Sequence, residues 1–162
     1  PSAEEKVIIG GNFARWYGGM ESFIIASEFK LPIWGQTSHA TRKEEWHLIE
    51  HLPRVTWIEW MQQLSTFKYA IHLMPTVAAG TFSLNCAYFG IPCIGNKNVD
   101  TQRLCHPELS VEVNDLDTAR TLAIRLRDDQ EFYNKCSKIA SENYKKYYNI
   151  DIWRNKIKNI II

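Results

Sequence analysis

The chain has 162 residues, of which 45% are hydrophobic and 23% are charged. This length is typical of one domain with a sizeable core, and the apolar content excludes a disordered chain. The 19 basic and 18 acidic side chains give a net charge of +1. This balance excludes the strong basic excess of a general nucleic-acid-binding surface, so we expect no nucleic-acid partner.

Six short and mostly apolar runs predict β-strands. Each run ends at turn residues, and none alternates strictly between apolar and polar positions, which is typical of strands that are buried on both faces. In chain order the predicted strands are residues 7–9, 31–34, 55–58, 69–74, 91–94 and 109–113.

Longer amphipathic stretches between these runs predict helices. They cover residues 20–29, 42–52, 60–67, 81–89, 117–127, 130–148 and 152–162. Alternation of strands and helices favours parallel pairing with helices on both faces. The sequence therefore predicts a doubly wound α/β domain with a parallel sheet of about six strands. We expect one domain over residues 1–162, closed by C-terminal helices over 129–162.

Two loops that follow predicted strands carry residues suited to ligand binding. Open parallel sheets bind ligands at the carboxyl ends of their strands. Gly11 and Asn12 follow the first strand, and Gly80 and Thr81 open a helix after the fourth. A helix N-terminus attracts phosphate, although small residues also serve simply to make tight turns. The chain has neither a Gly-x-Gly-x-x-Gly fingerprint nor a phosphate-loop motif, which disfavours ordinary dinucleotide binding and ATP hydrolysis.

Three other features admit more specific hypotheses. His47, Glu50 and His51 match the His-x-x-Glu-His pattern of some zinc proteases. On a helix the two histidines would share one face, but a solvated charged face is the favoured interpretation, and we expect no metal.

His72 lies inside an apolar strand, where a hydrogen-bonded core histidine is favoured over a catalytic one. The four cysteines lack Cys-x-x-Cys spacing, which favours free thiols in a reducing compartment over a disulfide framework.

The middle of the chain resembles a known family. The segment from Tyr69 to Pro75, followed by Gly80-Thr-Phe-Ser-Leu-Asn-Cys-Ala-Tyr-Phe-Gly-Ile-Pro-Cys-Ile-Gly95, is similar to the donor-binding half of GT-B glycosyltransferases of the group 1 type. That half has a strand ending in Pro-Ser, a Gly-rich turn, a helix and a Gly-x-Pro-Val segment. The strand at residues 7–11 and the segments 113–133 and 150–153 follow in the same order, so the resemblance spans the whole chain.

The resemblance implies a function and several partners. The chain would be the C-terminal, donor-binding domain of a longer two-domain enzyme that transfers a sugar from a nucleotide-sugar to a glycan or lipid-linked acceptor. The missing N-terminal domain would bind the acceptor, so the isolated domain is expected to be inactive. No cofactor or metal is expected. We expect a cytoplasmic protein, and lipid-linked acceptors in the family suggest peripheral membrane association of the full-length enzyme.

The resemblance also suggests roles for individual residues. Gly11, Asn12, Arg15, Gly80 and Thr81 would bind the donor phosphates, and Arg15 is the only basic residue in its loop. The base and ribose would lie near three further side chains, Glu59, Trp60 and Asn85.

One departure from the family limits these assignments. Where many retaining members carry a Glu-x7-Glu pattern, this chain has Val77 and Asn85, so no catalytic residue is assigned. The loss of both glutamates favours an alternative function, a non-catalytic, flavodoxin-like binding or regulatory domain.

Overall fold

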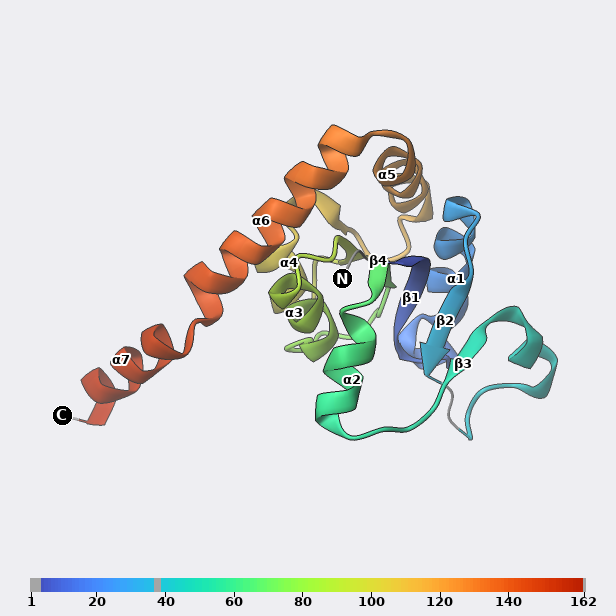
Figure 1. The fold of residues 1–162 in the computed structure, drawn as a ribbon. Helices are drawn as coiled ribbons and strands as arrows, with labels where there is room; N and C mark the ends of the chain where they lie inside the picture. The colour runs from blue at the N-terminus through green and yellow to red at the C-terminus, as the bar shows by residue number, and fades with distance from the viewer. Residues whose placement is uncertain (1–3, 37–38, 162) are drawn as a thin grey trace.

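A computed structural model describes residues 4–36 and 39–161 and shows one parallel sheet wrapped by helices (Figure 1). The sheet has six strands in the order β3-β2-β1-β4-β5-β6, and every neighbouring pair is parallel. The strands are β1 (Glu4–Asn12), β2 (Ile33–Gln36), β3 (Glu50–Leu52), β4 (Phe67–His72), β5 (Cys93–Asn96) and β6 (Ser110–Val111). The predicted doubly wound α/β fold is confirmed. The strand order is that of dinucleotide-binding folds, so the flavodoxin-like topology of the alternative is wrong.

Helices cover both faces of the sheet. The structure has α1 (Gly19–Ala26), α2 (Trp57–Leu64), α3 (Thr81–Tyr88), α4 (Asp100–Cys105), α5 (Leu116–Asp128), α6 (Gln130–Tyr148) and α7 (Ile150–Ile161). Four short 3-10 turns join them: η1 (Arg15–Tyr17), η2 (Ser27–Phe29), η3 (Lys43–Leu48) and η4 (Pro107–Leu109). The predicted C-terminal helix is present as α7, although Ile162 lies outside the described residues.

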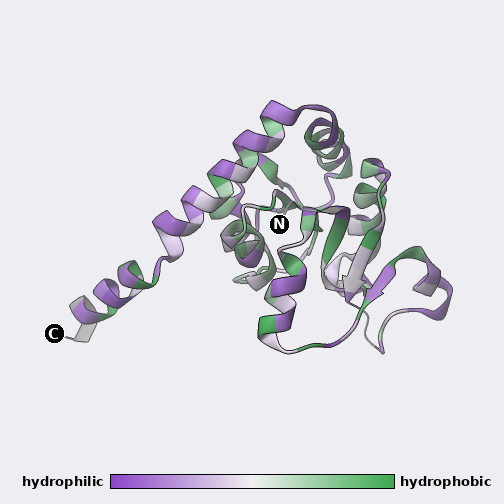
Figure 2. Cartoon of the chain, viewed as in Figure 1, coloured by the Kyte–Doolittle hydropathy of each residue, from purple (hydrophilic) through white to green (hydrophobic). Residues whose placement is uncertain are grey.

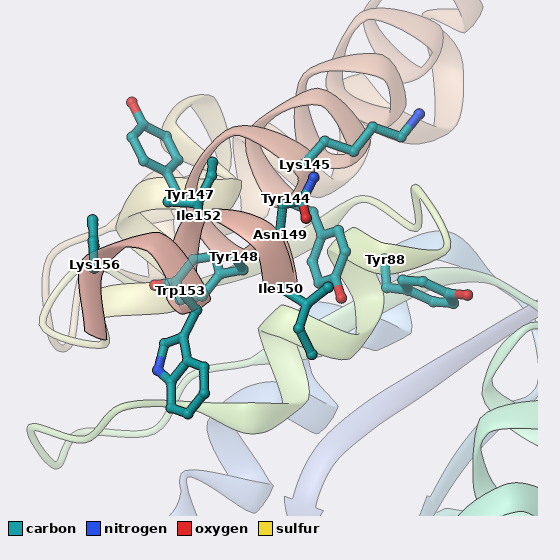
Figure 3. Close-up of a pocket in the computed structure, with 10 residues that line it drawn as sticks. All are labelled: Tyr88, Tyr144, Lys145, Tyr147, Tyr148, Asn149, Ile150, Ile152, Trp153 and Lys156. Atoms are coloured by element: carbon teal, nitrogen blue, oxygen red, sulfur yellow. The ribbon is translucent and has the colours of Figure 1, made fainter. Parts of the chain in front are cut away.

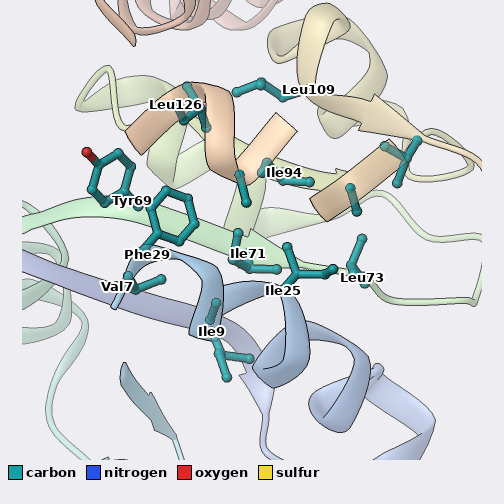
Figure 4. Packing of buried hydrophobic residues seen from close by; sticks show 14 of the residues in the cluster. Val7, Ile9, Ile25, Phe29, Tyr69, Ile71, Leu73, Ile94, Leu109 and Leu126 are labelled. Atoms are coloured by element: carbon teal, nitrogen blue, oxygen red, sulfur yellow. The ribbon is translucent and has the colours of Figure 1, made fainter. Parts of the chain in front are cut away.

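The apolar core is divided by the sheet into two layers. Val7 and Ile9 of β1 point toward α1 and α5, where they pack with Ile25 and Leu126 (Figure 4). Ile8, between them in sequence, points to the opposite face and packs in the layer under α2 and α3. Successive side chains of a strand alternate between faces, so a continuous apolar run such as 7–9 fills both layers.

The largest error in the predicted elements falls between residues 42 and 58. The predicted helix over 42–52 is instead η3 followed by β3, and the predicted strand over 55–58 is a loop that leads into α2. Thr56 is the N-cap of α2: its Oγ1 accepts from the Glu59 amide, and the Glu59 carboxylate accepts from the Thr56 amide at 2.8 Å. This Thr-x-x-Glu capping box is a helix-start signal that outweighs the β-branched run around it.

A further helix, α4, was missed in the sequence because its six residues show no clear apolar period. Its buried Gln102 explains its position: the side-chain amide donates to the Cys93 carbonyl at 2.8 Å and to the Leu109 carbonyl at 3.3 Å. These bonds tie α4 to β5 and to the turn before β6. A polar contact of this kind is visible only in the folded chain.

All four cysteines are buried and unpaired: Cys86, Cys93, Cys105 and Cys136. Burial raises the pKa of Cys105 and of Cys136 to about 11 and raises the pKa of Cys86 well above the usual thiol value. The thiols of Cys86, Cys105 and Cys136 are therefore protonated at neutral pH, and all four cysteines serve as small apolar core residues.

The last two helices differ in how they meet the body of the domain. Helix α6 buries Phe132, Cys136 and Ala140 along one face, while its outer face and much of α7 are hydrophilic (Figure 2). Helix α7 extends away from the sheet at the end of α6 (Figure 1). Within residues 4–36 and 39–161, none of the helices combines the length and hydrophobicity needed to cross a membrane.

Candidate functional site

A groove of about 380 Å³ opens at the carboxyl ends of the central strands. It lies beside β1 and β4, where the strand order reverses direction, which is the usual ligand position in open α/β sheets. Residues from four segments line it: the end of β1, the end of β2, the start of α2 with the loop before it, and the first turns of α3. They are Gly11, Gln36, Val55, Trp57, Trp60, Thr81, Phe82 and Asn85.

One wall of the groove is the N-terminus of α3. Gly80 is its N-cap, in the left-handed conformation at φ 73°, and no side chain caps the first turn. A side chain at Gly80 would lie 2.6 Å from Thr101 Oγ1, which donates to the Gly80 carbonyl. The first backbone N–H groups of α3 therefore have no hydrogen-bond partner within the helix, and they lie at the end of α3 that borders the groove. A helix N-terminus of this kind favours the binding of an anion.

The floor of the groove depends on two successive glycines at the end of β1. A side chain on Gly10 would lie 2.7 Å from Cγ of His72 and would also collide with the Phe82 ring. Gly11 has φ 71°, a conformation that favours glycine. The absence of a side chain at Gly10 lets Phe82 of α3 approach the end of β1 closely.

His72 lies under this floor at the end of β4. Its ring packs edge-on against the Phe82 ring, with centroids 5.2 Å apart, and the residue is only 5% exposed. Burial lowers its pKa to about 4, so the imidazole is neutral at pH 7. The predicted core location is correct, but the predicted hydrogen bonding is wrong for one ring nitrogen, because Nε2 has no partner among the described residues.

The structure brings together half of the residues predicted for donor binding. Gly11, Trp60, Thr81 and Asn85 all line the groove, although they come from three separate segments of the chain. Gly80 stands directly before Thr81 as the helix cap. Gly11, Gly80 and Thr81 were predicted from their place at a strand end or a helix start. Asn85 was predicted from the family resemblance, and Trp60 lies within α2 rather than after the strand that was predicted at 55–58.

The other three predicted residues lie outside the groove lining. The Arg15 guanidinium is exposed and lies 3.5 Å from the Glu45 carboxylate. The Glu59 carboxylate caps α2, and its hydrogen bonds with Thr56 lower its pKa. Asn12 ends β1, where it pairs with Gln36 across a shift in register.

Four lining residues were missed in the sequence: Gln36, Val55, Trp57 and Phe82. Trp57 and Trp60 lie one turn apart on α2, so recognising the capping box at Thr56 would have placed both on one helix face. Phe82 carries no signal of its own, because an aromatic residue in a helix is usually read as core.

The His-x-x-Glu-His pattern does not form a metal site. His47 lies in η3, whereas Glu50 and His51 lie on β3, so the helix that would align them is absent. The His51 ring instead stacks on Trp46 at 4.0 Å, and its Nε2 is 2.7 Å from the Trp46 carbonyl oxygen. Among residues 4–36 and 39–161, no three His, Cys, Asp or Glu side chains are placed to hold a metal ion.

A second cavity, of about 530 Å³, lies at the junction of α6 and α7 (Figure 3). Tyr88, Tyr144 and Trp153 supply much of its aromatic wall, and Lys145 and Lys156 lie at its edge. Tyr88 is the last residue of α3 and Thr81 is the first, so this cavity lies at the opposite end of α3 from the groove. It is therefore separate from the strand ends where ligands of this fold class bind.

Comparison with known proteins identifies the fold. No protein-family model and no curated protein matches the sequence. The C-terminal domain of LpcC, a group 1 family glycosyl transferase from Francisella tularensis, matches with a TM-score of 0.75 at 13% identity, covering 92% of this chain and 88% of that domain. The chain therefore has the fold of a GT-B glycosyltransferase C-terminal domain, as the resemblance implied.

Two longer proteins match over part of their length. HepE from Anabaena, solved in complex with UDP-glucose, has a TM-score of 0.74 at 11% identity, covering 96% of this chain and 48% of HepE. Sucrose-phosphate synthase from Thermosynechococcus elongatus has a TM-score of 0.73 at 16% identity, covering 99% and 45%. The chain thus spans about half the length of these two proteins.

Proposed function

We propose that this chain is the donor-binding domain of a glycosyltransferase and that its groove holds the nucleoside diphosphate of a nucleotide-sugar. The observation that carries the proposal is the uncapped N-terminus of α3, which opens into a groove at the switch point of the sheet. HepE, which shares the fold, was solved with UDP-glucose. The non-catalytic alternative keeps the fold but predicts no nucleotide affinity.

The groove offers a suitable partner for each part of a nucleoside diphosphate. We assign the phosphates to the backbone of Gly11 and Gly80 and to the amide and hydroxyl of Thr81, with Asn12 nearby and Arg15 supplying a positive charge from the rim. In sugar transfer, negative charge grows on the leaving phosphate, and fixed amide donors stabilise it without a metal or other cofactor. We assign the ribose to Asn85 and the base to Trp60, with Glu59 directly before Trp60 on α2.

The full reaction needs more than this domain. Val77, at the position of a family glutamate, is 84% exposed and cannot carry charge or a proton. We propose that an N-terminal domain of the same enzyme supplies the acceptor site and any catalytic base, and that the acceptor is a glycan or a lipid-linked sugar. The chain alone is then expected to bind the donor weakly and to transfer no sugar.

Removing single groove contacts should weaken nucleotide binding. UDP, GDP and ADP are titrated into the chain by calorimetry, and Thr81→Ala, Asn85→Ala and Arg15→Ala are compared for the nucleotide that binds. Each loss of a hydrogen bond or charge is expected to cost about threefold to tenfold in affinity. Thr121→Ala, on the exposed side of α5, is the control and should leave affinity unchanged. Failure of all three nucleotides to bind the unaltered chain would contradict the donor-binding proposal.

We further propose that the surface of α7 and the end of α6 contacts anionic lipid headgroups in the full-length enzyme, at the cytoplasmic side of a membrane. Five exposed cations lie in this stretch, together with one acidic residue, Asp151, which pairs with Arg154 at 3.6 Å. Trp153 is 62% exposed beside them. Amphipathic helices with lysines and an exposed tryptophan bind such surfaces. The cations are Lys145, Lys146, Arg154, Lys156 and Lys158.

Reversing two of these charges tests the membrane proposal. The double variant Lys156→Glu/Lys158→Glu should bind phosphatidylglycerol vesicles about tenfold or more weakly in a sedimentation assay, since each lysine contributes about 1 kcal/mol. Lys43→Glu/Arg54→Glu changes the net charge equally at other exposed positions and should have little effect. Equal binding to phosphatidylcholine vesicles, or equal loss in both variants, would contradict a specific surface.

A further inference from the structure

The buried side chain of His72 is the least explained polar group near the groove. It is the last residue of β4, and the pairing of Ile71 with Ile9 places it beside Gly10 and Gly11. Its Nε2 is fully buried without a hydrogen-bond partner among the described residues. An unpaired buried polar atom costs free energy in the folded chain, so its retention calls for an explanation.

Gly10 and Gly11 separate the His72 ring from the groove. A Cβ atom built on Gly11 would lie 3.6 Å from His72 Nε2 and 3.4 Å from Cβ of Tyr17, which are ordinary contact distances. Gly11 itself lines the groove. A ligand oxygen held against the bare side of Gly11 would therefore lie close to His72 Nε2, which is buried without a partner among the described residues.

A second buried histidine also has an unpaired ring nitrogen, but its surroundings differ from those of His72. His106 is also buried and also has one unpaired nitrogen, Nδ1. However, the Nε2 of His106 lies 2.9 Å from the Ser83 carbonyl oxygen. Neither histidine lines the groove itself, but His72 lies directly behind Gly11, which does. His106 thus has a packing role under α3, whereas His72 adjoins a groove wall that has no side chain.

We propose that His72 is a binding residue of this groove, whose Nε2 hydrogen-bonds an oxygen of the ligand held against Gly11. The inference rests on the proposed donor-binding function. The oxygen belongs either to the diphosphate or to the sugar of a nucleotide-sugar. A neutral imidazole orients such an oxygen without adding a fixed charge to the groove.

Two substitutions at His72 test the hydrogen bond. His72→Leu removes it at similar volume, and His72→Gln keeps a nitrogen donor near the position of Nε2. For the nucleotide-sugar that binds the unaltered chain, calorimetry should show roughly tenfold weaker binding by the Leu variant and nearly full affinity in the Gln variant. Ile8→Val, which thins the same core layer without touching the groove, controls for lost stability.

Comparing ligands identifies the oxygen. An equal loss for UDP and UDP-glucose assigns the contact to the diphosphate, whereas a loss for UDP-glucose alone assigns it to the sugar. Ligand binding should also shift the ¹⁵N resonance of His72 Nε2 in the unaltered chain and leave His106 unmoved. This measurement decides the matter even where the Leu variant fails to fold.

The outcomes separate this inference from the function on which it rests. Binding of UDP or UDP-glucose with an unmoved His72 resonance, or with full affinity of a folded Leu variant for both ligands, overturns the role of His72 alone. No binding of any nucleotide by the unaltered chain overturns the donor-binding proposal and this inference together.

Discussion

Lowering the pH from 7 to 4 is expected to reduce the free energy of unfolding by roughly 3 kcal/mol for each of two buried histidines. Burial lowers the pKa of His72 and of His106 to about 4, while the unfolded chain titrates near the ordinary value of 6.5. Between these values the unfolded chain binds more protons than the folded one. Stability is therefore complete above about pH 6.5 and is lost as the pH falls toward 4.

Urea unfolding at a series of pH values measures this loss. His72→Leu should remove about half of the pH dependence between 6.5 and 4, because the remaining half belongs to His106. The capping carboxylates Glu59 and Asp115 have lowered pKa values, so their stabilising contribution begins to fall only near the ordinary values of 4.5 and 3.8, and the loss between pH 6.5 and 5 belongs to the histidines. A stability that stays constant from pH 7 to pH 5 would show that neither histidine is held neutral by the fold.

Replacing Gly18 with alanine is expected to destabilise the domain by about 3 kcal/mol or more. Gly18 has φ 66°, and a Cβ there would lie 2.7 Å from the Leu73 carbonyl carbon and closer still to its oxygen. The Leu73 peptide cannot easily move away, because its N–H donates to Ser22 Oγ at 3.0 Å. The substitution therefore combines backbone strain with a collision between the loop after β1 and the end of β4.

Gly90→Ala separates the two causes. Gly90 has φ 67°, but a Cβ there would meet no atom closer than Ser137 Oγ at 3.1 Å, the Ser137 carbonyl oxygen at 3.3 Å and Ser141 Cβ at 3.8 Å. This variant should lose about 1–2 kcal/mol from strain alone. Thermal and urea unfolding of both variants provide the measurement, and equal losses would show that the Leu73 contact is unimportant.

The sequence predicted the strands of the sheet correctly where apolar runs are continuous. The prediction was wrong where a helix-capping motif lies within an apolar run, and where a strand has no apolar run. Residues 7–9 and 69–74 fill both core layers, so their run is unbroken and the strand is evident. Residues 55–58 carry the same kind of run, yet Thr56 and Glu59 form a capping box and the chain turns into a helix. The exposed β3 is short and polar, with no apolar run to mark it.

The sequence predicted which backbone segments form the candidate site, but not which contacts their side chains make. Gly11, Thr81 and Asn85 line the groove because the fold class fixes where strands end and helices begin. The engagement of Arg15 with Glu45 depends on the path of η3, which the sequence predicted wrongly. The unpaired nitrogen of His72 depends on three segments meeting in space, and no local pattern encodes it.

The central position of β1 has a consequence for how the chain acquires its structure. β1 pairs with β2 on one side and with β4 on the other, and β4 follows only after β2, β3 and α2. Until β4 joins, one edge of β1 exposes unpaired backbone groups and apolar side chains, which is a template for aggregation. A fragment that ends before β4 is therefore expected to aggregate rather than fold. In the complete chain, the whole sheet is expected to form in one slow, cooperative step.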